Sequence, residues 1–146
     1  MKRKNANTRE VTFFSEKCGE VISTFGTAAR ALAERLERDG QVLKYQSKVL
    51  VHIDPSTTPT LGIRNAYIKE DWFSDFSVET VEGEIYIIEA IFSDDLRKKS
   101  EVEKVELSRR YWMAKGISWR LCIIPSPGKI RTTVSNKDKR SDSFYD

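Results

Sequence analysis

The clearest pattern of apolar positions in the chain is a pair of short strands joined by a tight turn. Residues 72–80 are rich in types that favour β-structure, and residues 85–92 form a second such run. Gly83 in the intervening turn supplies the positive φ that a tight hairpin connection needs. The second run is apolar on both faces except at Glu89, which is typical of a central strand. The pattern predicts a buried β-hairpin in a sheet that helices cover on both sides.

Upstream of this hairpin the pattern predicts one helix and two strands. Helical spacing begins near Phe13 and is clearest from Thr24 to Asp39, and Gly40 is placed to cap the helix at its C-terminus. A strand is expected over Gln41 to Ile53, and a loop with two prolines ends it. A second, short strand over Ala66 to Lys69 then leads into the hairpin.

Downstream of the hairpin the pattern predicts a helix and a final strand. Ser100 and Glu103 have the spacing of an S-x-x-E capping box, so a helix should run from Ser100 to about Ala114. Trp119 to Ile124 is apolar and short enough for a buried strand. A right-handed crossover would place this strand parallel to the strand that carries Glu89. The predicted fold class is therefore α/β, with a mixed central sheet flanked by helices.

The length of 146 residues is that of one domain with a substantial core. The formal net charge is only +3, so overall charge is a weak argument for nucleic acid. Basic residues gather near the two ends, and we expect flexible basic arms over residues 1–12 and 129–146. Lys129 and Arg131 in the second arm could contact DNA phosphates, although charged termini are also ordinary solvated segments.

The residue types present exclude several classes of site. A single histidine, His52, and the lack of a CxxC pair exclude a zinc cluster and a histidine-based triad. Cys18 and Cys122 are far apart and no secretory signal precedes them, which favours reduced thiols in a cytoplasmic protein. No apolar run approaches the ~20 residues of a membrane span, so no membrane partner is expected.

Two acidic residues stand among the apolar positions of the hairpin, Asp75 on the first strand and Glu89 on the second. Burying a carboxylate without a partner is costly, and a divalent metal is the usual reason for such a pair. An acid on one strand, followed on the next by an acid and then a lysine two residues on, resembles the metal site of the PD-(D/E)XK nuclease superfamily. Residues i and i+2 of a strand share a face, and the oxygen ligands suit Mg²⁺.

The residues around this pair narrow the resemblance to one family. Residues 98–112, read through to Trp119, closely resemble the helix and following strand of TnsA, the endonuclease subunit of a heteromeric transposase in certain bacterial transposons. Residues 74–78 are similar to that family's DF strand, and residues 23–46 are compatible with its first helix and next strand. The resemblance covers most of residues 23–124 and implies a restriction-endonuclease-like (PD-(D/E)XK) core.

The resemblance implies cleavage of DNA at transposon ends, with Mg²⁺ as cofactor and a transposase subunit as partner. Asp75 matches the metal-binding aspartate, and Glu89 matches the second metal-binding position. The chain departs from the family at two places. Ile91 stands where the catalytic lysine belongs, and residues 25–29 lack the glutamate of the first helix. Such losses typically cost orders of magnitude in rate.

Other side chains could rebuild the catalytic site. The replacement lysine could be Lys98, Lys99 or Lys104, and the replacement acid could be Glu34 or Glu37. Arg109 and Arg110 on the helix after the metal strand could contact DNA phosphates. With these groups in place, the chain would be a Mg²⁺-dependent DNA endonuclease.

Two alternatives need no catalysis. In the first, the chain is an inactive relative that kept the fold as a DNA-binding or assembly module, such as a non-cutting transposition subunit or a phage DNA-handling protein. In either case its partner besides DNA could be a transposase subunit or a second copy of the chain. In the second, the two acids are purely structural and neighbouring arginines satisfy them, namely Arg97, Arg109 or Arg110.

Overall fold

The computed structural model describes residues 9–127, and these form an α/β fold. The elements in chain order are β1 (Glu10–Ser15), β2 (Glu20–Phe25), α1 (Thr27–Arg38), β3 (Val42–Val51), α2 (Asn65–Lys69), β4 (Trp72–Thr80), β5 (Ile85–Phe92), the 3-10 helix η1 (Ser93–Arg97), α3 (Lys99–Ala114) and β6 (Ser118–Ile124). Residues 10–12, which we expected in an arm, thus begin strand β1.

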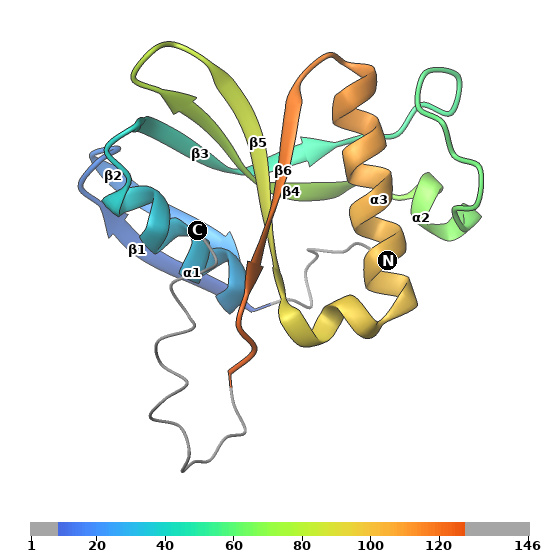
Figure 1. Ribbon diagram of the computed structural model, residues 1–146, viewed down its shortest axis with the longest axis horizontal. Coiled ribbons are helices and arrows are strands. Elements are labelled where there is room, and N and C mark those ends of the chain that lie inside the picture. Colours follow the sequence, from blue (N-terminus) through green and yellow to red (C-terminus); the bar gives the residue numbers. More distant parts are fainter. Residues whose placement is uncertain (1–8, 128–146) are drawn as a thin grey trace.

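Four of these strands form a mixed sheet in the order β3-β4-β5-β6. The pairs β3–β4 and β4–β5 are antiparallel, and β5–β6 is parallel. Strands β1 and β2 form a separate antiparallel hairpin (Figure 1). The sheet thus confirms the predicted hairpin, the strand expected over Gln41 to Ile53 and the parallel final strand.

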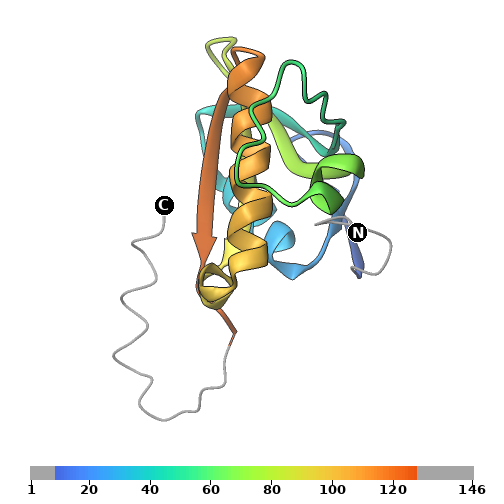
Figure 2. The ribbon, with the colours of Figure 1, turned by 90° about the vertical axis from the view of Figure 1, so that its right-hand side faces the viewer.

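Two helices pack on the sheet, and each helix does so through its own hydrophobic cluster. The first, which we call the α1 core, packs α1 on the sheet and includes Leu32, Phe76 and Val78. The second, the α3 core, includes Trp72 of β4 together with Leu107 of α3. Figure 1 shows α1 and α3 on opposite sides of β5 and β6, and Figure 2 shows α3 running beside β6. Both faces of the central strands are therefore buried, as their continuous apolar sequence predicts.

Strand β4 changes the face that it buries partway along its length. Phe76 lies in the α1 core, whereas Trp72 lies in the α3 core, although a regular strand would point both to one face. The register with β3 pairs Ser47 with Phe76 and Val49 with Ser74, and the residues between them, Lys48 and Asp75, lie outside it. Opposite this point, Lys48 of β3 has a φ of 55°, a left-handed backbone that interrupts the regular alternation of β3. We call this place the β3–β4 kink.

The helix expected to begin near Phe13 starts only at Thr27. Residues 10–25 form the β1–β2 hairpin instead, and its register places Phe14 opposite Val21. Both segments are rich in β-branched and aromatic residues, and Gly19 takes the positive φ of 74° in the turn. Strand pairing across the hairpin therefore outweighs the local helical spacing.

The short strand expected over Ala66 to Lys69 is also wrong, because residues 65–69 form helix α2. Tyr67 on this helix is buried in the α3 core. The helical turn places Tyr67 in that core, although the segment itself is not part of the described sheet. Tertiary packing thus decides the conformation of this segment.

Both helix caps inferred from sequence differ in the structure. Helix α1 ends at Asp39, whose Oδ1 accepts the N–H of Gln41 at 2.9 Å, and Gly40 has no positive φ. Helix α3 begins one residue early, with Lys98 as its N-cap and no capping side chain. Glu103 instead binds Arg64, with Oε1 3.0 Å from Nε, so the capping box does not form.

Two further expectations can be placed on the described residues. Cys18 and Cys122, the two cysteines within residues 9–127, are not joined by a disulfide bond. No helix in this part of the chain is long and apolar enough to cross a membrane.

Two serines of helix α3, Ser100 and Ser108, allow a matched test of these assignments, because only Ser108 has a buried hydrogen-bond partner. The Ser108 hydroxyl accepts the indole N–H of buried Trp72 at 2.9 Å. Ser108→Ala should lower the free energy of unfolding by about 1–3 kcal/mol, because it leaves that indole without an acceptor. Ser100→Ala should change it by less than about 0.5 kcal/mol, since Ser100 is not the N-cap. Urea unfolding of both variants measures the difference, and a larger loss for Ser100→Ala would contradict it.

Candidate functional site

Asp75 lies at the β3–β4 kink and is only 5% exposed. Its Oδ2 accepts the backbone N–H of Ala90 on β5 at 2.8 Å. The backbone register between β4 and β5 runs from Glu79 opposite Ile85 to Phe76 opposite Ile88, and it stops just before Asp75. The carboxylate thus continues the connection between the two strands where the backbone pairing has ended. This is a structural use of the acid.

Glu89 is fully buried at the side of β5 that faces α3. Its Oε2 accepts two hydrogen bonds, from the Ser74 hydroxyl at 2.7 Å and from the Trp119 indole at 3.2 Å. The Ser74 oxygen in turn accepts the indole N–H of Trp112 at 2.9 Å. We call these four residues the Glu89 cluster. They come from β5, β4, β6 and α3, so one carboxylate connects three strands and a helix.

The two acids therefore lie on neighbouring strands, as the sequence predicted, and each of them accepts hydrogen bonds from the protein's own donors. The Ser74 hydroxyl, the Trp119 indole and the Ala90 N–H all point donors at the carboxylates. These donors occupy one oxygen of each acid, Oε2 of Glu89 and Oδ2 of Asp75, so a metal ion at these two oxygens would have to displace them. Within residues 9–127 no group of three or more His, Cys, Asp or Glu side chains is arranged to hold a metal ion.

A separate hollow of about 270 Å³ lies beside Ala90–Phe92. The start of α1 forms another wall, with Gly26, Thr27 and Ala28. The two departures from the nuclease pattern therefore meet at one place, because Ile91 and the acid-free start of the first helix both line this hollow. Its remaining lining residues are Phe25, Asp95, Lys98 and Glu101.

Of the three lysines proposed as replacements, Lys98 and Lys104 are each paired with a nearby acid. Lys98 lines the hollow, and its Nζ lies 3.1 Å from Oδ1 of Asp95. The pKa of Lys98 is raised, chiefly by the hydrogen bond to Asp95, so this amine stays protonated. Lys104 is largely buried, with its Nζ 3.6 Å from Glu101 and 5.1 Å from the ring centre of Tyr67. Of the two, Lys98 is the one placed at the hollow.

Glu37, the proposed replacement acid, lies near the C-terminal end of α1. It accepts hydrogen bonds from the hydroxyls of Ser15 and Tyr45 and from the N–H of Lys17 at 3.3 Å. Burial raises the pKa of Glu37, but these bonds outweigh it and the net pKa is lowered. The residue thus fastens the β1–β2 hairpin and β3 to α1, at the end of the helix away from the hollow.

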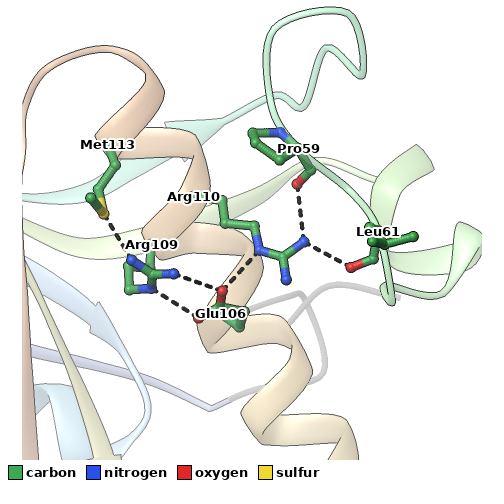
Figure 3. A network of polar contacts seen from close by, with 6 residues as sticks. All are labelled: Pro59, Leu61, Glu106, Arg109, Arg110 and Met113. Atoms are coloured by element: carbon green, nitrogen blue, oxygen red, sulfur yellow. Dashed lines mark hydrogen bonds and ion pairs between the residues drawn. The ribbon is translucent and has the colours of Figure 1, made fainter.

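Arg109 and Arg110 both bind Glu106 on the same helix (Figure 3). Arg110 also donates to the carbonyl oxygens of Pro59 and Leu61, at 3.2 and 2.9 Å, and so holds the loop before α2 against α3. Neither arginine satisfies the hairpin acids through these contacts. The other proposed DNA contacts, Lys129 and Arg131, lie outside the described residues.

Sequence reasoning did not identify Ser74 or Trp119 as partners of Glu89. Ser74 precedes Asp75, and in a regular strand it would point to the opposite face from the one that it takes. A polar residue next to an acid in an apolar strand was the available signal. The kink that turns it toward Glu89 has no signature in the local sequence.

Comparison with known proteins does not assign the chain to a family. No protein-family model matches the sequence, and no curated protein matches it.

The Glu89 cluster predicts a large structural effect and no metal effect. Glu89→Ala should lower the free energy of unfolding by about 3 kcal/mol, because it opens a cavity and leaves two buried donors without their acceptor. Glu84→Ala in the exposed turn is the matched control and should be near neutral. Added Mg²⁺ should not raise the melting temperature of the wild type. A rise that Asp75→Asn and Glu89→Ala both abolish would show that the acids hold a metal.

The arginine pair on α3 predicts a specific pH dependence. Hydrogen bonds from Arg109 chiefly lower the pKa of Glu106, partial burial opposes them, and Arg110 adds to them, so that the pKa falls from 4.5 to about 2. A lowered pKa stabilises the fold above the unfolded value and loses this contribution as pH falls toward 2.

Glu106→Gln should therefore lower the free energy of unfolding by about 1 kcal/mol at neutral pH, a value reduced for solvent screening. The difference from wild type should shrink between pH 4.5 and pH 2. Urea unfolding across this range measures it, with Glu82→Gln in the exposed turn as control. A difference that grows on acidification would contradict the assignment.

Proposed function

We propose that the protein is a DNA-binding module with a nuclease-like fold that does not cleave DNA. The observation that carries this proposal is the Glu89 cluster together with the Asp75 to Ala90 bond. Both acids of the presumptive metal pair serve as acceptors for the protein's own donors. These bonds hold β4, β5 and β6 together, which gives both acids a role in the fold that needs no metal ion.

The nuclease-like architecture is supported by the order and placement of the elements. A mixed sheet carries the two acids on adjacent antiparallel strands, and a helix then leads to a parallel strand. The two positions where the chain departs from the TnsA pattern also line the same hollow. This is what loss of catalytic groups from one former site would produce. The partner would be DNA, with a transposase subunit or a second copy of the chain alongside.

A second candidate is an active endonuclease with a relocated lysine. It is favoured by one observation, the position of Lys98 in the hollow beside Ile91. In this reading the Lys98 ammonium stabilises the charge that develops on the phosphate. Asp95 and Glu101, which also line the hollow, would be the acids nearest to it.

A combined binding and cleavage assay separates the two candidates. The non-cleaving module should bind duplex DNA with an affinity that falls as salt increases, and should not nick supercoiled DNA in Mg²⁺. Asp75→Asn should leave that binding within about twofold. Nicking that both Lys98→Ala and Asp75→Asn abolish would instead establish the active enzyme. No binding at low salt would overturn both candidates.

A further inference from the structure

A groove of about 500 Å³ lies between the second half of α1 and strands β5 and β6. The groove lies on the side of the sheet that α1 covers, whereas Glu89 lies on the side that faces α3. Its lining residues are Leu32, Arg35, Leu36, Arg38, Asp39, Tyr86, Ile88, Arg120, Leu121 and Cys122. We call it the α1–β6 groove.

The charged residues of this groove are unbalanced. Three arginines line it, Arg35, Arg38 and Arg120, against one acid, Asp39. Arg38 and Arg120 are exposed, so their guanidinium groups are accessible to a ligand. A guanidinium group can donate two parallel hydrogen bonds to the oxygens of one phosphate, and its flat face can stack on a planar ring. The rim therefore favours an anion that also carries a flat surface.

The floor of the groove is apolar and aromatic. Leu32 and Leu36 from α1 meet Cys122 from β6 within the α1 core. The guanidinium carbon of Arg120 lies 3.7 Å from the ring centre of Tyr86, so the arginine covers the tyrosine. The Arg35 Nη1 donates to the Cys122 Sγ at 3.6 Å, which directs this arginine across the floor. One face of a flat ligand could thus pack on the floor while its phosphate meets the rim.

We propose that the α1–β6 groove binds an unpaired nucleotide of single-stranded DNA. Duplex DNA presents its phosphates outside and keeps its bases stacked inside. Its bases therefore cannot contact the apolar floor of the groove. A single strand offers both a base that can leave the stack and the phosphate beside it. This inference rests on the proposed DNA-binding function and specifies the strand that the groove takes.

The test compares labelled oligothymidylate with a labelled duplex by fluorescence anisotropy on the full chain. Arg120→Ala should weaken binding of the single strand about tenfold or more, the range expected for loss of one stacked base. Arg120→Lys keeps the charge but removes the flat surface, and it should lose most of the same affinity. Both variants should bind the duplex within about threefold of the wild type.

The control removes one positive charge elsewhere. Lys44 is exposed on β3, at the opposite edge of the sheet from β6, and Lys44→Ala should leave the single-strand affinity within about twofold. Thermal unfolding checks that each variant is folded.

Four results would overturn the inference alone, and a fifth would overturn the proposed function with it. Equal weakening by Arg120→Ala and Lys44→Ala would show charge attraction only, and full affinity in Arg120→Lys would exclude stacking. Stronger binding of oligouridylate than of oligothymidylate would assign the groove to RNA. Duplex binding that persists while the groove variants have no effect overturns this inference alone, whereas loss of all DNA binding in the wild type overturns the proposed function as well.

Discussion

The fold depends on how one buried carboxylate is satisfied. Glu89 is fully buried, and a polar group in that position is costly unless it is hydrogen-bonded. Ser74 and Trp119 supply them, and Trp112 fixes the hydroxyl of Ser74 in turn. Because these donors come from β4, β6 and α3, satisfying Glu89 fixes the position of the helix on the sheet. A requirement of a single side chain thus becomes a constraint on four elements.

The β3–β4 kink makes this arrangement possible. Without the reversal at Lys48 and Asp75, Ser74 would point toward the α1 core and could not reach Glu89. The same kink ends the backbone pairing with β5, and Asp75 replaces it by accepting the N–H of Ala90. Two acids in a pattern typical of a nuclease are therefore part of the framework.

Some arginines of the protein form contacts within the fold, whereas others are exposed at the α1–β6 groove. On α3, Arg109 and Arg110 bind Glu106, and Arg110 also secures a loop. On the other side of the sheet, Arg38 and Arg120 are exposed along a groove with an apolar floor. Arg109 and Arg110, which the sequence analysis proposed as DNA contacts, thus form ion pairs and hydrogen bonds within the protein.

The sequence by itself determined the elements whose pattern is long and regular. These are the β4–β5 hairpin, strand β3, helix α3 and the parallel final strand β6. It also placed Asp75 and Glu89 on neighbouring strands. Local patterns could not show that residues 10–25 pair with each other, that Glu103 binds Arg64, or that Ser74 turns toward Glu89. Those outcomes depend on contacts between residues distant in the chain, and only the folded structure decides which partner each side chain meets.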